Sequence, residues 1–321
     1  MIKFLGLFIF LTLLGYLYDR YKFKYEGDEE LNRYEKMKEY LLNDSASGLM
    51  AKPILWIHND KEVNSRKWLS FGSRNSEKTN SGYLQACLET IVKKNGEDFN
   101  VCLIDDTSFE KLIPDWNIKL HKLSNPVKKH IRTLALTKIL YYYGGLLVPD
   151  SLILKKSLKD MYDSGISKTG MFSVECYNRT NTSDYTELFP TSTFMGCKKN
   201  NQGMRELSIY IEKLTSIDNT NESDFLGQIN RYLFKLSQEH KVNIVNGCVI
   251  GVKNVRGCII RLDDLFEEER PDFNDNMVGI YIEKDELLRR KKYSWFVNMN
   301  RKEILKSNCF IGKYVLTCQD I

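Results

Sequence analysis

The stretch Tyr-Tyr-Tyr-Gly-Gly-Leu-Leu-Val-Pro-Asp-Ser, residues 141–151, joins a predicted helix to a predicted buried strand. Apolar residues recur at helical spacing from about Val127 to Tyr142. Gly144-Gly145 then ends the helix, because glycine readily adopts the backbone conformations of a helix C-cap. The apolar run Leu146–Val148 that follows is typical of a strand buried on both faces. The stretch therefore predicts a helix that leads directly into an inner strand of a sheet.

Two upstream apolar runs extend this into an alternation of strands and helices. Ile54–Ile57 and Phe99–Ile104 predict strands, and Tyr83–Lys94 between them has apolar residues at helical spacing. The order strand, helix, strand, helix, strand favours an α/β fold with a mostly parallel sheet and flanking helices.

The second half of the chain carries a more mixed pattern. We expect a short strand at Thr193–Gly196 and helices at about Gln202–Leu214 and Phe225–His240. Asn-Gly is a common hairpin turn, so Asn246-Gly247 predicts two short strands within Val242–Val252.

Polar residues follow each of the three predicted parallel strands. Ligands of open α/β sheets bind beyond the carboxyl ends of the strands. His58, Asp105, Asp106 and Asp150 are therefore candidate ligand contacts. Each also has a simpler interpretation: a local hydrogen bond for His58, a helix N-cap for one of the paired aspartates, and an ordinary loop position for Asp150.

Composition and motifs exclude several other classes of protein. The 321 residues carry a net charge of +5, and basic residues are scattered among acids, which argues against a nucleic-acid partner. The eight cysteines form no C-x-x-C pair, and the four histidines are not spaced as zinc ligands. Neither a phosphate-loop motif nor a G-x-S-x-G motif is present.

The N-terminus predicts a membrane anchor. Phe4–Tyr18 is apolar and uncharged, although as a helix it would span only about 22 Å of a bilayer core of roughly 30 Å. No small-residue cleavage pattern follows it. We expect residues 1–20 to form a signal anchor, a single transmembrane helix, with a buried N-terminal helix as the alternative. Residues 21–50 are expected to form a stem and linker, 51–300 the folded domain and 301–321 a C-terminal tail.

The segment His130–Leu158 resembles the sugar-binding region of glycosyltransferases that carry a D-x-D motif, the relatives of initiating mannosyltransferases and capsular polysaccharide synthesis enzymes. Pro53–Ile57 is similar to the first strand of that family, and Thr191–Leu214 to the strand and helix after its nucleotide site. Most of residues 52–300 also resembles glycosyltransferase-like proteins of large DNA viruses.

This resemblance implies a GT-A-like, Rossmann-like fold, a nucleotide-sugar donor and a glycan or glycoprotein acceptor. It also implies Mn²⁺ or Mg²⁺, because the charge of the leaving diphosphate is usually neutralised by a divalent cation on the D-x-D carboxylates. The candidate metal ligand is Asp150, the acidic residue nearest to those positions. With such a donor, the candidate nucleotide-sugar contacts are His58, Arg74, Asp105, Asp106, Gly144, Gly145 and Asp150.

The chain departs from the family pattern at its most informative positions. Pro149 and Ser151 stand where the family has its two aspartates, with Asp150 between them. Thr133 and Leu136 stand where the preceding helix usually carries Asp and Arg. Adjacent side chains of a strand point to opposite faces, so Asp150 replaces its neighbours only if a bulge re-aims it.

Two functions remain open from the sequence. The first is a membrane-anchored glycosyltransferase, which the resemblance to viral proteins would place at a host endomembrane or in a virion. The second is a glycosyltransferase-fold protein that has lost catalysis and serves as a binding or scaffold module, which the missing carboxylates favour.

Overall fold

The computed structural model describes residues 52–59, 82–180, 183, 186–217 and 221–320. These described residues all belong to one compact unit. The predicted anchor, the stem and Arg74 lie outside them. No helix within the described ranges is both long enough and apolar enough to cross a membrane.

The described residues form a mixed α/β structure around a six-stranded sheet of order β2-β1-β3-β6-β5-β7. β1 pairs in parallel with β2 and β3, β5 pairs in parallel with β7, and β6 runs antiparallel to its neighbours β3 and β5. The prediction of a mostly parallel sheet is therefore confirmed. The strands are β1 Ile54–His58, β2 Asn100–Ile104, β3 Gly145–Val148, β5 Met171–Tyr177, β6 Leu188–Cys197 and β7 Asn243–Val245.

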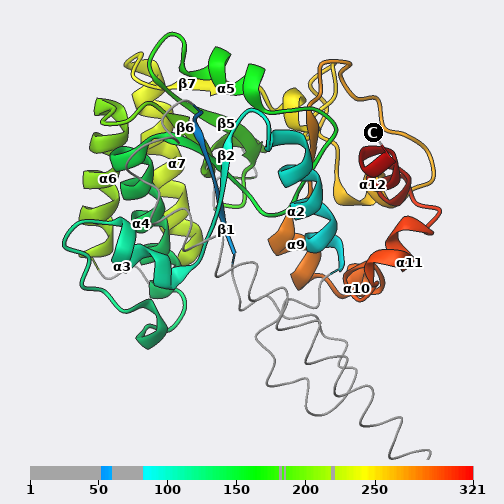
Figure 1. Ribbon diagram of the computed structural model, residues 1–321, viewed down its shortest axis with the longest axis horizontal. Coiled ribbons are helices and arrows are strands. Elements are labelled where there is room, and N and C mark those ends of the chain that lie inside the picture. The colour runs from blue at the N-terminus through cyan, green and yellow to red at the C-terminus, as the bar shows by residue number, and fades with distance from the viewer. Residues whose placement is uncertain (1–51, 60–81, 181–182, 184–185, 218–220, 321) are drawn as a thin grey trace, which may run out of the picture. The chain divides into compact units, whose positions relative to one another are not determined.

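The predicted helices flank this sheet. α4, α6 and α7 lie together on one side of the strands in Figure 1, and α2 lies on the other. A fifth helix, α5, packs against β5, β6 and β7. Their bounds are α2 Gly82–Asn95, α4 Val127–Tyr143, α5 Lys159–Ile166, α6 Gln202–Thr215 and α7 Glu222–Gln238.

The two glycines after α4 are required by the backbone. Gly144 and Gly145 have φ angles of 70° and 98°, which residues other than glycine rarely adopt. A Cβ on Gly145 would also collide with the carbonyl oxygen of Ile54 on β1. The Gly144 carbonyl accepts a 2.9 Å hydrogen bond from Trp56 Nε1, so the turn is fixed against the middle of the sheet.

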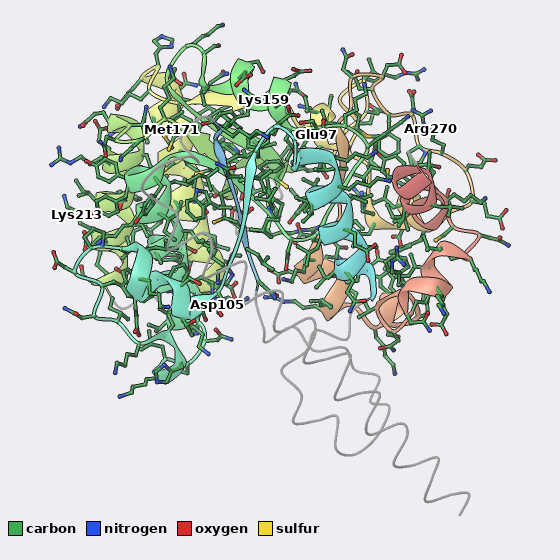
Figure 2. The ribbon with its side chains drawn as sticks, in the orientation of Figure 1. Glu97, Asp105, Lys159, Met171, Lys213 and Arg270 are labelled. Carbon is green, nitrogen blue, oxygen red and sulfur yellow. The ribbon has the colours of Figure 1, made fainter. Side chains whose placement is uncertain are left out.

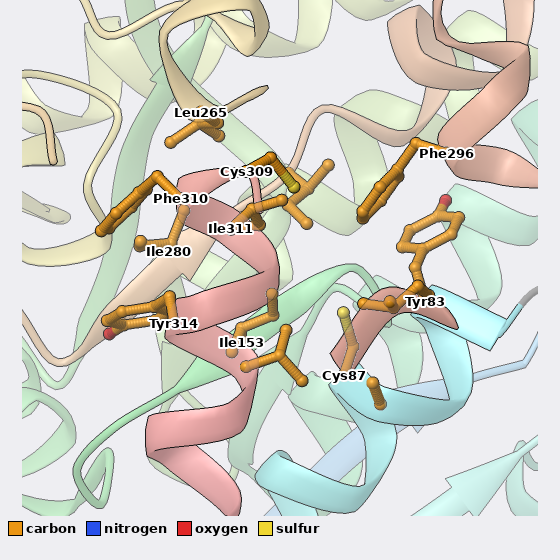
Figure 3. Packing of buried hydrophobic residues seen from close by; sticks show 14 of the residues in the cluster. Tyr83, Cys87, Ile153, Leu265, Ile280, Phe296, Cys309, Phe310, Ile311 and Tyr314 are labelled. Carbon is orange, nitrogen blue, oxygen red and sulfur yellow. The ribbon is translucent and has the colours of Figure 1, made fainter. Parts of the chain in front are cut away.

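A second, two-stranded sheet forms beside α2. β4 Leu152–Leu154 pairs antiparallel with β8 Gly279–Tyr281. Ile153 and Ile280 from these strands join Tyr83 and Cys87 of α2 in one buried cluster (Figure 3). Short helices surround it: α8 Leu262–Phe266, α9 Lys284–Arg289, α10 Ser294–Val297, α11 Arg301–Leu305 and α12 Phe310–Asp320.

Two C-terminal segments differ from their predicted roles. The segment predicted as a tail contains α11 and α12, and Ile304, Ile311 and Val315 belong to the buried cluster. The predicted hairpin at Asn246-Gly247 is wrong in its second strand. β7 ends at Val245, and the Asn246 side chain instead accepts from Cys248 N at the start of the 3₁₀ helix η5, Gly247–Ile250.

The remaining described helical elements are short. They are η3 Asp106–Ser108, α3 Phe109–Leu112, η4 Leu120–Lys122 and η6 Lys291–Tyr293. η3 and α3 directly follow β2, and they therefore shape the rim of the sheet on that side.

Candidate functional site

A cavity of about 500 Å³ opens at the carboxyl ends of β1 and β3. One wall comes from the main sheet and its helices, with His58 at the end of β1, Asp150 after β3 and Arg132 on α4. The opposite wall comes from the segment that follows β8, including Glu283 and Lys284. The cavity thus lies where residues from distant parts of the chain meet at the predicted rim of the sheet.

Asp106, beyond the carboxyl end of β2, is the centre of a three-residue network. Arg132 donates to both of its carboxylate oxygens, from Nε at 2.8 Å and from Nη2 at 2.7 Å. His58 Nε2 lies 3.0 Å from the same carboxylate. Burial alone would raise the pKa of Asp106, but the hydrogen bonds from His58 and Arg132 outweigh it and hold that pKa well below its usual range. Of the three residues, His58 and Arg132 line the cavity.

Asp105 has the structural role that the sequence offered as its alternative. Its carboxylate accepts from Thr107 N at 3.1 Å and Ser108 N at 3.0 Å, and so caps η3. The side chain is buried, and Figure 2 places the residue beside the carboxyl end of β2, far from Glu97 before the start of that strand. Asp105 is not among the residues that line the cavity.

Asp150 does line the cavity, and its carboxylate is paired. Lys284 Nζ lies 2.6 Å from Asp150 Oδ2. The neighbouring Ser151 hydroxyl donates a 2.6 Å hydrogen bond to the Ile282 carbonyl, and Ile282 N donates to Ser151 O at 2.9 Å. These bonds extend the β4–β8 ladder by one residue pair beyond Leu152–Tyr281, so they hold Asp150 and Lys284 on facing segments.

Glu283 is the most deeply buried carboxyl group of the cavity wall. It is 6% exposed, and burial raises the pKa of its carboxyl to about 7 although the Arg179 guanidinium, 4.0 Å away, opposes that shift. Asp285 and Glu286 add to the rise. A carboxyl group that changes charge near neutral pH is a common feature of functional sites, and it is also produced by burial alone.

His130 on α4 offers an unsatisfied polar atom at the same cavity. The residue is 4% exposed, and its ring stacks on Phe225 with ring centroids 3.7 Å apart. Burial lowers the pKa of His130, which favours the neutral ring. Its Nε2 has no hydrogen-bond partner within the described residues. Because buried polar atoms are nearly always paired, this nitrogen is a candidate ligand contact.

The donor set at Asp150 does not fit a divalent cation. Mn²⁺ and Mg²⁺ prefer several oxygen ligands. The Asp150 carboxylate is instead bound by an ammonium group. Pro149 has no side-chain oxygen, and the Ser151 hydroxyl donates its hydrogen bond to the Ile282 carbonyl. In the part of the chain that the structure describes, no three His, Cys, Asp or Glu residues are grouped to hold a metal ion. Metal binding at Asp150 therefore stays a prediction without support from the side chains around it.

The remaining predicted contacts lie away from the cavity or outside the described residues. Gly144 and Gly145 stand at the amino end of β3, whereas the cavity opens at the carboxyl end, and neither lines it. Arg74 lies outside the described ranges. The sequence pattern brought His58, Asp106 and Asp150 to one rim, and it gave no indication of Lys284, Glu283 and His130 as their neighbours.

The missed residues carried little signal in the sequence. Lys284 is 134 residues from its partner Asp150, and Glu283 and Lys284 follow a strand of only three residues. His130 was visible on a predicted helix, but nothing in its neighbours indicated that the ring would be buried against Phe225.

Comparison with known proteins gives distant structural neighbours. No family model matches the chain, and no curated protein matches it. Among solved structures, the PaToxG glycosyltransferase is 15% identical, with a TM-score of 0.32 over 64% of this chain and 77% of that one. The galactosyltransferase LgtC in complex with donor and acceptor sugar analogs is 13% identical, with a TM-score of 0.32 over 60% of this chain and 73% of that one.

Proposed function

We propose that this chain has a GT-A-like fold, binds a nucleotide sugar in the cavity beside Asp150 and transfers the sugar to a glycan or glycoprotein acceptor. One observation carries the proposal. The chain runs from β1 to β2 on one side and then to β3 on the other side of β1, so its path across the sheet reverses and the switch point lies between β1 and β3. Ligands of open α/β sheets bind at such a switch point, beyond the carboxyl ends of the strands, and the cavity lies there.

The size and lining of the cavity support a ligand with charged and apolar parts. A volume of about 500 Å³ falls in the usual range of small-molecule sites. Lys129, Arg132 and Lys284 supply positive charge suited to a diphosphate, while Leu136 and Leu226 supply apolar contacts suited to a base or a sugar ring. The His130 Nε2 atom, which has no hydrogen-bond partner among the described residues, is a candidate contact for a ligand polar group.

The positions that carry the family resemblance also line this cavity. Thr133, Leu136, Pro149 and Ser151 occupy the positions at which the D-x-D glycosyltransferases carry their Asp, Arg and two metal-binding aspartates. All four line the cavity. We therefore assign to this cavity the role of the donor site, with an altered set of charged residues.

A catalytically inactive binding protein is the second candidate. It is favoured by the loss of the two metal-binding aspartates at Pro149 and Ser151 and by the ion pair that engages Asp150. Such a protein would bind the nucleotide sugar, or the free nucleotide, without turnover.

We also propose that residues 1–20 anchor the chain in a membrane and that the protein acts at a host endomembrane or in a virion. The apolar run Phe4–Tyr18 is the support for this proposal. Vesicle flotation checks it: the whole chain is expected to float with lipid, and a chain without residues 1–20 is expected to remain in the dense fraction.

The activity is tested with the whole chain and a panel of nucleotide sugars, by measuring nucleoside diphosphate release and thermal shift both with Mn²⁺ and in EDTA. We expect at least one donor to stabilise the protein and to be hydrolysed slowly without an acceptor. The matched variants are Asp150→Ala, which alters the cavity, and Asp163→Ala, which removes an exposed aspartate paired with Lys159 on α5. Stabilisation without hydrolysis would support the inactive binding protein, and neither effect with any donor would contradict the proposed site.

A further inference from the structure

Lys284 stands where the D-x-D family requires a cation. Its ammonium nitrogen is 2.6 Å from Asp150 Oδ2. The two side chains are 19% and 12% exposed, so the pair is largely removed from solvent yet lines the cavity. A charge in such a place interacts more strongly with a ligand than a charge on the open surface does.

The backbone fixes this ammonium group at the rim of β3. Lys284 is two residues beyond Ile282, which exchanges two hydrogen bonds with Ser151. Ser151 follows Asp150 directly, and the β4–β8 ladder continues from there. The facing segments are therefore in register, and Asp150 acts as the group that orients Lys284.

An ammonium group has three N–H donors. The contact with Asp150 uses one of them. The remaining two are suited to phosphate oxygens, as in the lysines that bind phosphate in other nucleotide sites. Arg132, 10% exposed, adds a second largely buried cation to the same cavity.

We propose that Lys284 takes the place of the divalent metal, so that the cavity binds the diphosphate of its nucleotide ligand without Mn²⁺ or Mg²⁺. This inference rests on the proposed function. It follows from the donor set at residues 149–151, which fits an ammonium partner and does not fit a divalent ion.

Calorimetric titration of the whole chain in detergent tests the inference. After dialysis against EDTA, the protein is titrated with UDP, GDP, ADP and inorganic pyrophosphate, first in EDTA and then with millimolar Mn²⁺ or Mg²⁺. We expect at least one diphosphate to bind in EDTA, with a Kd within about threefold of its value with either metal. Inorganic pyrophosphate separates the contribution of the diphosphate from that of the nucleoside.

Matched lysine variants locate the effect. Lys284→Met is expected to weaken binding in EDTA by about 100-fold, because charge-assisted hydrogen bonds to the phosphates are lost. Lys284→Arg keeps the charge and is expected to stay within about tenfold of the unchanged protein. Lys159→Met is the control, since Lys159 Nζ is also 2.6 Å from an aspartate oxygen, that of Asp163, but does not line the cavity.

The outcomes separate the inference from the function on which it rests. Binding that requires Mn²⁺ or Mg²⁺ and disappears in EDTA would overturn the role of Lys284 and leave a nucleotide site in place. Unchanged binding by Lys284→Met would do the same. Absence of binding in every condition would overturn both. If circular dichroism shows that Lys284→Met does not fold, two other measurements test the inference. One is binding by Lys284→Gln, which keeps a donor for Asp150, and the other is the metal dependence of binding by the unchanged protein.

Discussion

Asp106 and Asp150 occupy matching places in the sheet and have different surroundings. Each is the second residue beyond the end of a parallel strand, Asp106 after β2 and Asp150 after β3. Asp106 receives two hydrogen bonds from Arg132 and contacts His58, all from the main sheet and its helices. Asp150 forms an ion pair with Lys284, which lies in the segment after β8.

The difference shows how one edge of the sheet can hold one aspartate that stabilises the fold and another that faces the ligand cavity. The Asp106 network satisfies its carboxylate, orients His58 and Arg132, and leaves Asp106 itself off the cavity wall. The Asp150 pair lies on the wall, where its lysine retains donors for a ligand. We infer that the Asp106 network chiefly stabilises the fold and that the Asp150 pair chiefly serves binding.

The largest effect is expected when the Asp106 network is broken. Asp106→Ala removes the carboxylate that binds the largely buried Arg132 guanidinium, and we expect a loss of about 3 to 4 kcal/mol in the free energy of unfolding. Urea unfolding at pH 7 measures it. The lowered pKa means that the contribution is complete above about pH 4, the range of an unfolded aspartate, and is lost only as pH falls through the lower folded value.

An exposed ion pair gives the control for this experiment. Asp263 bonds Lys292 and is more than half exposed, so Asp263→Ala is expected to change stability by no more than about 0.5 kcal/mol. Equal losses in the two variants would remove the distinction drawn for Asp106.

The second effect is an increase in the free energy of unfolding, and it concerns Glu283 in the cavity wall beside Lys284. An unfolded glutamate ionises near pH 4.5, whereas the pKa of Glu283 is about 7 when folded. The stability that this difference provides is full below pH 4.5 and is lost as pH rises through 7. Glu283→Gln removes the ionisation, so at about pH 8 we expect it to be more stable than the unchanged protein by about 3 kcal/mol.

Urea unfolding at about pH 5 and about pH 8 checks the sign. The Gln side chain is close in shape to the protonated carboxyl, so the two proteins should differ little at the lower pH. Arg179, Asp285 and Glu286 surround Glu283 and remain in the variant. A stability difference that is the same at both pH values would contradict the raised pKa.

The sequence predicted the side of the rim that belongs to the main sheet. β1, β2 and β3 and the helices α2 and α4 follow from apolar runs and helical spacing that are local in the chain. Because parallel strands share one carboxyl edge, the sequence alone could place His58, Asp106 and Asp150 at the same edge of the sheet.

The opposite wall could not be predicted in the same way. β4 and β8 have three residues each, too few for a periodic pattern, and their pairing joins positions far apart in the chain. The sequence therefore could not predict that Lys284 pairs with Asp150. Asn246 shows a different limit, since Asn-Gly suits a hairpin turn and asparagine also suits a helix N-cap, and only tertiary packing decided between them.

The smallest stability effect separates the two aspartates most sharply. Asp150→Asn keeps the shape of the side chain and weakens one charged hydrogen bond beside a cavity, so we expect a loss of about 1 kcal/mol in the free energy of unfolding. Its effect on ligand binding should be larger than this, because Lys284 loses the carboxylate that orients it. We expect nucleoside diphosphate affinity in EDTA to fall by more than about tenfold, yet by less than for Lys284→Met, since the ammonium charge remains. Urea unfolding and calorimetry on the same preparation give both values. A loss of about 3 kcal/mol or more, on the scale of Asp106→Ala, with unchanged affinity would assign the Asp150 pair to support and leave the cavity without its proposed cation.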